Sequence, residues 1–124
     1  MNKAKILVVD DDAKLSALTR VILERMGGYA VREENRSFAA LSAAREFSPD
    51  LIILDVNMPG KEGGDVAREL RELPQFAATP ILFLTSLVSK EENGMLGGWR
   101  FLGKPVAPQL LLDTVRGLLP AMAA

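Results

Sequence analysis

The sequence predicts an α/β fold in which helices cover both faces of a parallel β-sheet. Short apolar runs alternate with amphipathic stretches five times along the 124 residues, and this alternation is typical of parallel sheets. The apolar runs are continuous, as in Leu51–Leu54, which indicates strands buried on both faces. With 48% hydrophobic residues, a chain of this length can bury the core of one domain. We therefore expect residues 1–124 to form a single domain.

The N-terminal part of the chain contains two predicted strands with a helix between them. Lys5–Val9 and Tyr29–Arg32 are the apolar runs. Asp12 is a residue type favoured at helix N-caps, and apolar residues follow it at helical spacing. The pair Gly27-Gly28 then ends this helix.

The middle of the chain continues the alternation. Ser37 is a candidate N-cap for a second helix, which Pro49 ends. Leu51–Leu54 is the third predicted strand. Asp65–Leu73 has the apolar spacing of a helix, and Ile81–Leu84 is the fourth strand.

The C-terminal part is predicted as a weak helix, a fifth strand and a final helix. The weak helix covers Ser89 to about Gly94, and Trp99–Leu102 is the strand. Pro108 suits the first turn of the last helix. Right-handed crossovers leave few topologies for five such units. We expect a flavodoxin-like (βα)5 three-layer sandwich with strand order 2-1-3-4-5.

Several polar residues follow directly on predicted strands. In parallel sheets, ligands bind outside the carboxyl ends of the strands, so one site can collect these side chains. They are Asp10, Asp11, Asp55, Thr85, Ser86 and Lys104.

Composition excludes several classes of chemistry and partner. The chain has no Cys and no His, which removes disulfides, thiolate sites and imidazole bases. Its net charge is −1, so we expect no direct binding of nucleic acid. No apolar run is long enough to cross a membrane. Because the N-terminus also lacks an apolar signal segment, we expect a cytoplasmic protein without membrane contact.

The acidic strand ends favour phosphoryl chemistry. Clustered carboxylates repel one another unless a cation lies among them, and all-oxygen ligands suit Mg²⁺. Asp55 follows an apolar strand and precedes Pro59-Gly60, which indicates a carboxylate at a loop mouth. Such a carboxylate can accept a phosphoryl group to give an aspartyl phosphate. A metal ion and a lysine would neutralise the phosphoryl oxygens.

Four separated motifs now identify a resemblance. They are Val8-Val9-Asp10-Asp11-Asp12, Asp55-Val56-Asn57-Met58-Pro59-Gly60, Thr85-Ser86 and Lys104-Pro105. In this order and on these predicted elements, they resemble the receiver domain of bacterial two-component response regulators. The resemblance spans nearly the whole chain, and the four motifs together are highly specific.

The resemblance implies a role for each matching residue in the site. Asp55 matches the phospho-accepting aspartate. Asp10 and Asp11 match the acidic pair that helps to hold Mg²⁺, with Asp11 the more direct ligand. Asn57 matches the residue whose backbone carbonyl is a metal ligand.

The resemblance also implies a switch. Thr85 and Lys104 match the residues that contact the phosphoryl oxygens, and the Lys104-Pro105 bond matches a cis peptide. Phe101 matches an aromatic switch position, where a ring turns inward as the Thr85 hydroxyl moves towards the phosphoryl group. Core packing is an equally good interpretation of Phe101. For Trp99, local packing is the simpler interpretation, and an exposed partner-binding role is the alternative.

The chain departs from the family pattern in three places. From Thr85 to Gly97-Gly98 it is several residues shorter than usual, so we expect a short or irregular fourth helix there. This places the usual output face and the usual receiver dimer in question. Val106 stands where the family often has Phe, and the family's Gly between Glu34 and Ala40 is missing.

The implied partners are a histidine kinase or a histidine phosphotransfer protein, since the donor imidazole must come from outside this chain. The downstream partner is unknown, and a homodimer is an open option. No output domain follows Ala124, so we expect either a stand-alone receiver or one domain of a longer protein.

Three other functions stay open from the sequence. A receiver-like module could bind proteins without phosphorylation. A haloacid-dehalogenase-type phosphatase would use Asp10 as nucleophile, but it needs an acidic pair after Lys104, where only Asp113 lies. A flavodoxin would need a Ser/Thr-rich phosphate loop after the first strand, which this chain lacks.

Overall fold

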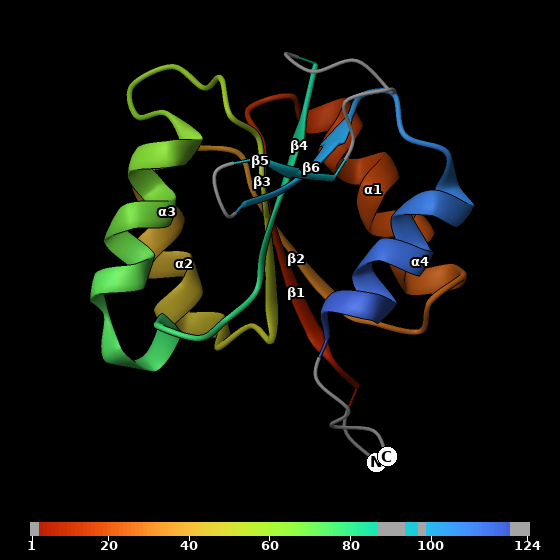
Figure 1. The fold of residues 1–124 in the computed structure, drawn as a ribbon, viewed down its shortest axis with the longest axis horizontal. Helices are drawn as coiled ribbons and strands as arrows, with labels where there is room; N and C mark the ends of the chain where they lie inside the picture. The colour runs from red at the N-terminus through yellow and green to blue at the C-terminus, as the bar shows by residue number, and fades with distance from the viewer. Residues whose placement is uncertain (1–2, 87–93, 97–98, 120–124) are drawn as a thin grey trace.

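Six strands form one sheet in the computed structural model, which describes residues 3–86, 94–96 and 99–119 (Figure 1). The strands are β1 (Lys5–Val9), β2 (Ala30–Glu34), β3 (Leu51–Leu54), β4 (Ile81–Thr85), β5 (Gly94–Leu96) and β6 (Trp99–Gly103). Their order is β2-β1-β3-β4-β6-β5. The five parallel strands confirm the predicted order 2-1-3-4-5, with β6 as the fifth. The antiparallel edge strand β5 is an addition that the sequence did not predict.

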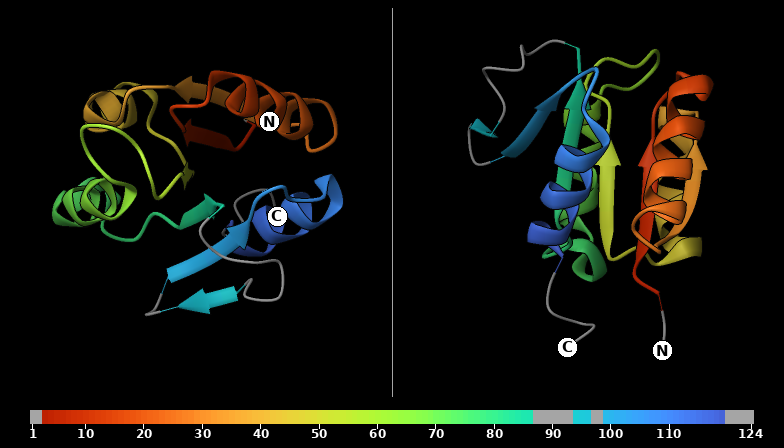
Figure 2. Two further views of the ribbon diagram at one scale, coloured as in Figure 1. Left: turned by 90° about the horizontal axis from the view of Figure 1, so that it is seen from above. Right: turned by 90° about the vertical axis from the view of Figure 1, so that its right-hand side faces the viewer.

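Helices cover both faces of this sheet (Figures 1 and 2). They are α1 (Ala13–Arg25), α2 (Ala40–Phe47), α3 (Gly63–Glu72) and α4 (Pro108–Leu118), with short 3-10 turns η1 (Ser37–Ala39) and η2 (Pro74–Phe76). One hydrophobic core lies between the sheet and α2 and α3. The other lies between the sheet and α1 and α4. This is the predicted three-layer sandwich. No helix among the described residues is long and apolar enough to span a bilayer.

The helix ends show which capping predictions hold. The Asp12 carboxylate accepts a hydrogen bond from the Leu15 N–H at 3.1 Å, as predicted for an N-cap. The prediction for Ser37 is wrong, because α2 begins after Ala39 and Ser37 opens η1. The buried Ser37 hydroxyl instead donates to the Pro59 carbonyl at 3.0 Å and accepts from the Lys61 N–H at 3.2 Å. A contact with a distant loop therefore takes the place of a local cap.

The predicted fourth helix falls almost wholly on residues 87–93, which lie outside the described part of the chain. Its last residue, Gly94, begins β5 and pairs with Phe101 of β6. Gly94 is thus part of a sheet edge and not of a helix, because this backbone pairs with β6.

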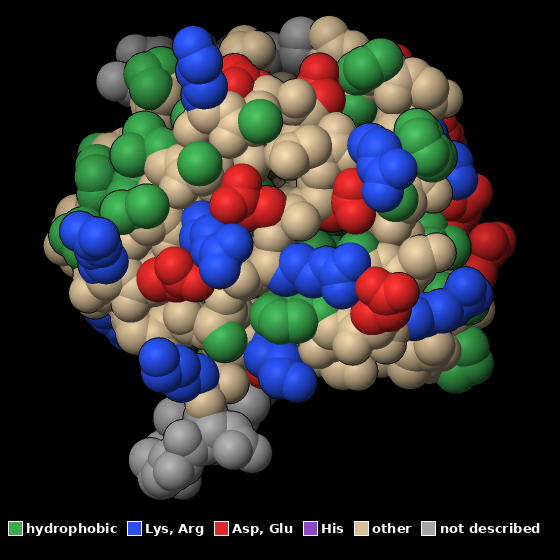
Figure 3. Space-filling view, turned by 180° about the vertical axis from the view of Figure 1, so that it is seen from behind, with side chains coloured by type: hydrophobic (Ala, Val, Ile, Leu, Met, Phe, Trp, Pro, Cys, Tyr) green, Lys and Arg blue, Asp and Glu red, His purple; other side chains and the backbone are tan. Residues whose placement is uncertain are grey.

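Charges of both signs are mixed over the face seen in Figure 3. Elsewhere in the described chain, exposed ion pairs include Arg32 with Glu46 at 2.9 Å and Arg20 with Glu24 at 3.0 Å. Such exposed pairs each contribute little to stability. That face therefore presents no broad basic surface, in keeping with the balanced composition.

Candidate functional site

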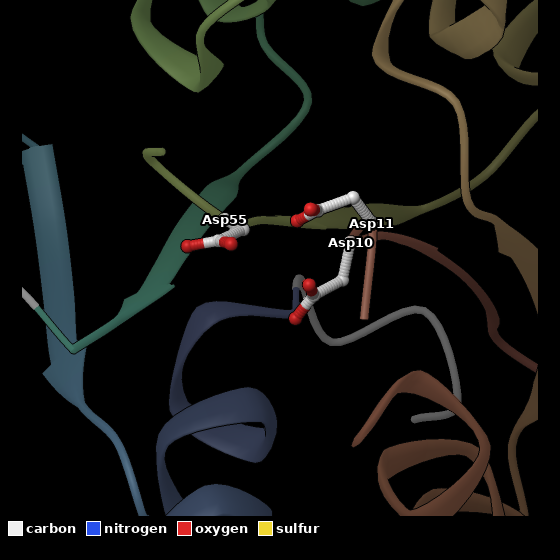
Figure 4. Close-up of side chains that lie close together, drawn as sticks. All are labelled: Asp10, Asp11 and Asp55. Carbon is white, nitrogen blue, oxygen red and sulfur yellow. The ribbon is translucent and has the colours of Figure 1, made fainter. Parts of the chain in front are cut away.

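Three carboxylates meet at the carboxyl edge of the sheet (Figure 4). Asp10 and Asp11 follow β1, and Asp55 follows β3. β1 and β3 are parallel neighbours with Val9 opposite Leu54, so the chain leaves both strands at the same level. One carboxylate oxygen from each residue lies within 4.8 Å of the others. The predicted gathering of these side chains is therefore present.

Asp10 is held firmly in this cluster. It is 4% exposed, and its carboxylate accepts from the Asp12 N–H at 3.0 Å. Its backbone carbonyl accepts from the Asn35 side-chain amide at 2.8 Å, and Asn35 also donates to the Ser16 hydroxyl at 2.9 Å. These contacts tie the strand exit to α1 and to the loop after β2.

Lys104 joins the two buried carboxylates. Its Nζ lies 2.8 Å from Asp10 Oδ2 and 3.5 Å from Asp55 Oδ2. Its backbone N–H donates to the Thr85 carbonyl at 2.8 Å, which places Lys104 beside the end of β4. Thr85 itself is buried, with 1% of its surface exposed. The Lys104-Pro105 peptide is cis, as the resemblance implied.

Burial raises the pKa of Asp55, which is 8% exposed. The Lys104 charge acts against this shift and lowers the pKa, whereas the Asp10 carboxylate raises it further. The backbone N–H of Asn57 donates to the Asp55 carboxylate and lowers its pKa. An added cation would relieve the repulsion between the carboxylates.

The donor set fits a hard divalent cation. All three side chains offer carboxylate oxygens within reach of one ion, and Asp11 is exposed so that one side stays open to water. Mg²⁺ prefers oxygen ligands and keeps several waters. The cluster thus suits a metal ion that shares its shell with solvent or with a phosphate.

The loop after Asp55 is shaped by a glycine that the sequence reasoning did not single out. A Cβ on Gly63 would clash with the carbonyl oxygen of Asp55, and the Gly63 N–H donates to the Val56 carbonyl at 2.9 Å. The first residue of α3 thus lies directly against the exit of β3. The pair Gly63-Gly64 ahead of a helix was the available signal, because Gly permits such close backbone approach.

The remaining predicted residues do not belong to the group of three carboxylates. Asn57 and Ser86 are exposed. Phe101 lies outside the acidic cluster, half-buried on β6, and stacks on Phe83 with 5.0 Å between ring centroids. Trp99 packs its ring edge-on to Phe83 at 5.6 Å. Local packing is therefore part of the role of both residues.

Comparison with known proteins decides the family. Residues 6–116 match the family model described as the response regulator receiver domain. The chain belongs to this family. It is 38% identical over 123 residues to the transcriptional regulatory protein ResD of Bacillus subtilis, covering 95% of this chain and 49% of ResD. It is 34% identical over 121 residues to GltR of Pseudomonas aeruginosa, covering 95% of this chain and 50% of GltR.

Solved receiver structures share its fold. The chemotaxis protein CheY4 of Vibrio cholerae superposes with a TM-score of 0.82 at 35% identity, over 94% of this chain and 99% of CheY4. Family membership sets aside the phosphatase and flavodoxin hypotheses. The receiver function stands, and the Asp10, Asp11 and Asp55 cluster fits the phosphorylation site of such a domain.

The chain spans about half the length of the curated relatives it matches. One relative, MtrA of Mycobacterium tuberculosis, is named a DNA-binding response regulator and is 35% identical over 120 residues, or 94% of this chain and 51% of MtrA. The expectation that this protein has no contact with nucleic acid therefore finds no support.

Proposed function

We propose that residues 1–124 act as one phosphoacceptor domain in which Asp55 receives a phosphoryl group with the help of Mg²⁺. The donor is a phosphohistidine of a kinase or phosphotransfer protein. One observation carries this proposal. The Asp55 carboxylate lies at a buried loop mouth within 4.8 Å of the Asp10 and Asp11 oxygens and 3.5 Å from Lys104 Nζ.

The transfer is a displacement at phosphorus. An Asp55 carboxylate oxygen attacks the phosphorus atom, the P–N bond of the donor breaks, and its electron pair returns to the donor imidazole. Asp10, Asp11 and Asp55, together with the Asn57 backbone carbonyl, would hold Mg²⁺, which supplies charge neutralisation for the phosphoryl oxygens.

Lys104 and Thr85 are the proposed contacts on the other side of the phosphoryl group. Lys104 already lies between Asp10 and Asp55, so a short shift of its ammonium towards Asp55 would pair it with a phosphoryl oxygen. Thr85 would donate its hydroxyl from the end of β4. In this proposal, the domain assists its own phosphorylation and dephosphorylation. It does not act as a turnover enzyme on a small-molecule substrate.

The response to phosphorylation is proposed to run from Thr85 to Phe101. Movement of Thr85 towards the phosphoryl group changes the space beside β4, and the half-buried Phe101 ring is free to repack there. The phosphoryl group favours one of two existing arrangements through these contacts.

Intact-mass measurement after incubation with Mg²⁺ and acetyl phosphate tests the acceptor. We expect one phosphoryl adduct in the native chain and none in Asp55→Asn. Asp113→Asn is the matched control, because this exposed residue lies on α4 away from the cluster, and it should keep the adduct. A full adduct in Asp55→Asn would overturn the assignment. No adduct in any variant, with no Mg²⁺ binding, would favour a module that binds proteins without phosphorylation.

Trp99 offers a direct test of the switch, because it is the single Trp of the chain. It lies on β6 two residues before Phe101, and both rings contact Phe83. Phosphorylation should change its emission in the native chain, and Asp55→Asn should show no such change. Unchanged emission in a fully phosphorylated sample would contradict the proposed switch.

A further inference from the structure

The side-chain amide of Asn35 reaches the turn that carries Asp10 and Asp11, although Asn35 lies in the loop after β2. It donates to the Asp10 backbone carbonyl at 2.8 Å. This carbonyl belongs to the peptide that joins Asp10 to Asp11. On the other side of Asp10, its backbone N–H donates to the Glu34 carbonyl at 3.1 Å. Both polar groups of the Asp10 backbone are therefore held by the segment that ends β2.

Asp11 is the carboxylate of the cluster whose position depends most on its backbone. The Asp10 carboxylate accepts from the Asp12 N–H and pairs with Lys104, and Lys104 also lies near Asp55. Asp11 is exposed, and its side chain makes no hydrogen bond or ion pair with any residue that the structure describes. Figure 4 shows this side chain extending towards Asp55. The plane of the peptide before Asp11 therefore decides where its carboxylate lies.

The contacts of the Asn35 amide fix its orientation. Its second N–H donates to the Ser16 hydroxyl at 2.9 Å, and Ser16 is buried on α1. The single Ser16 hydroxyl proton has two acceptors in reach, a Glu33 carboxylate oxygen at 2.8 Å and the Ala13 carbonyl at 3.2 Å. The shorter, charge-assisted bond is the stronger one. Ser16 therefore donates to Glu33 and accepts from Asn35, and a flipped amide would lose both of its bonds.

We propose that Asn35 is a positioning residue that holds the Asp10-Asp11 peptide and so sets the spacing of the cation ligands. This rests on the proposed function, in which those carboxylates hold Mg²⁺. Asn35 acts through the peptide and does not contact the ion. Mg²⁺ demands near-ideal octahedral geometry, whereas Ca²⁺ accepts a variable ligand arrangement. A fixed peptide before Asp11 therefore favours Mg²⁺ over Ca²⁺.

Titration calorimetry of the whole chain with Mg²⁺ and with Ca²⁺ tests this role. Asn35→Ala should raise the Kd for Mg²⁺ about tenfold, the usual effect of losing a group that orients metal ligands. It should raise the Kd for Ca²⁺ by no more than about twofold, because Ca²⁺ tolerates the looser site. The substitution replaces one neutral side chain by another, so a change in the charge of the site cannot explain the loss.

A nitrogen-15 NMR spectrum without metal gives a second readout. The Asp11 backbone N–H belongs to the peptide that Asn35 holds, so its cross-peak should move in Asn35→Ala. Thermal unfolding checks that the variant folds. A purely structural role would lower the unfolding temperature without changing the ratio of the two Kd values.

Two buried hydroxyls of α1 supply a matched pair of variants. Ser16→Ala removes the acceptor of the second Asn35 N–H and should raise the Kd for Mg²⁺ roughly threefold. Combined with Asn35→Ala, it should add little, because both changes break one network. Thr19→Ala is the control, since the buried Thr19 hydroxyl donates only to the Leu15 carbonyl at 2.9 Å and lies outside this network. Its Kd for Mg²⁺ should stay within about twofold of the native value.

Three results would overturn the inference while the native chain binds Mg²⁺. These are an unchanged Kd in Asn35→Ala, equal losses of Mg²⁺ and Ca²⁺ affinity, and an Asp11 cross-peak that does not move. Equal Mg²⁺ affinities of Ser16→Ala and Thr19→Ala would count against the network as well. A native chain that binds no Mg²⁺ would overturn the metal part of the proposed function and this inference with it.

Discussion

The acidic edge (Asp10, Asp11, Asp55 and Lys104) and the aromatic margin (Phe83, Trp99 and Phe101) lie on neighbouring strands but are built differently. At the acidic edge, the carboxylates of Asp10 and Asp55 are buried, and Lys104 lies 2.8 Å from Asp10. At the aromatic margin, ring packing is the main contact, and a pocket of about 370 Å³ lies beside it.

Under the proposed function, this difference would separate the phosphoryl chemistry from the conformational response. Phosphoryl transfer needs atoms held in place, because positioning and charge stabilisation are its main requirements. A switch needs an element with two arrangements of similar free energy, and half-buried rings beside a pocket can repack at lower cost than a fully packed core. The acidic edge and the aromatic margin meet at the end of β4, which Thr85 forms.

The largest loss of stability is expected at Gly63, where the backbone of the acidic edge leaves no space for a side chain. Gly63→Ala should lower the free energy of unfolding by about 3 kcal/mol, because the new Cβ meets the Asp55 carbonyl and overpacking has costs of this order. Urea unfolding measures this loss. Gly64→Ala is the adjacent control, since its Cβ meets only Arg68 Nη1 at 3.8 Å. It should stabilise α3 by up to about 1 kcal/mol, and equal losses in both variants would contradict the argument.

A smaller effect should come from the aromatic margin. Phe101→Ala should cost about 2 kcal/mol, less than a fully buried Phe, because its ring is only half-buried. The same variant should leave the Kd for Mg²⁺ within a factor of two, which isothermal titration can measure. A tenfold loss of Mg²⁺ affinity would show that the two margins are not independent in the unphosphorylated state.

Ser37 tests how the acceptor loop is held to the acidic edge. Its buried hydroxyl joins Pro59 and Lys61 to the loop after β2. Ser37→Ala should cost roughly 1 to 1.5 kcal/mol, the usual cost of losing such bonds, and should weaken Mg²⁺ binding. The exposed Ser42→Ala on α2 is the control and should be neutral or slightly stabilising. Equal stability of the two variants would show that the Ser37 hydroxyl does not hold the acceptor loop in place.

The smallest effect concerns the ionisation of Asp55. Its pKa is raised in the folded state, so the folded chain binds this proton more tightly than the unfolded chain, and stability falls as pH rises through the raised pKa. Asp55→Asn should therefore be more stable than the native chain at pH 7 without Mg²⁺. The difference should vanish below about pH 4, the pKa of an unfolded Asp.

Binding of Mg²⁺ should reverse this order of stability, so that the native chain becomes more stable than Asp55→Asn. Mg²⁺ at ten times its Kd should stabilise the native chain by roughly 1.4 kcal/mol, whereas Asp55→Asn loses a carboxylate ligand and should gain less. Thermal unfolding with and without Mg²⁺ measures both. A native chain that is more stable than Asp55→Asn in metal-free buffer at pH 7 would contradict the pKa argument.

Much of the acidic edge could be predicted from local sequence. Asp10, Asp11 and Asp55 each follow an apolar run, and parallel strands bring such positions to one edge. The Asp12 cap was equally predictable, because it depends on residues three apart. The role of Ser37 was not predictable. Its hydroxyl suits a helix cap locally, but it forms hydrogen bonds with a loop more than twenty residues away.

The sequence alone determined the layer order, the parallel sheet and the acids at its edge, because period, capping and strand ends are local properties. Only the tertiary structure decided that Gly63 must lie against Asp55, that β5 extends the sheet beside β6, and that Trp99 and Arg68 line one pocket. These depend on which distant backbones meet, and neither hydrophobic period nor motif spacing encodes such contacts.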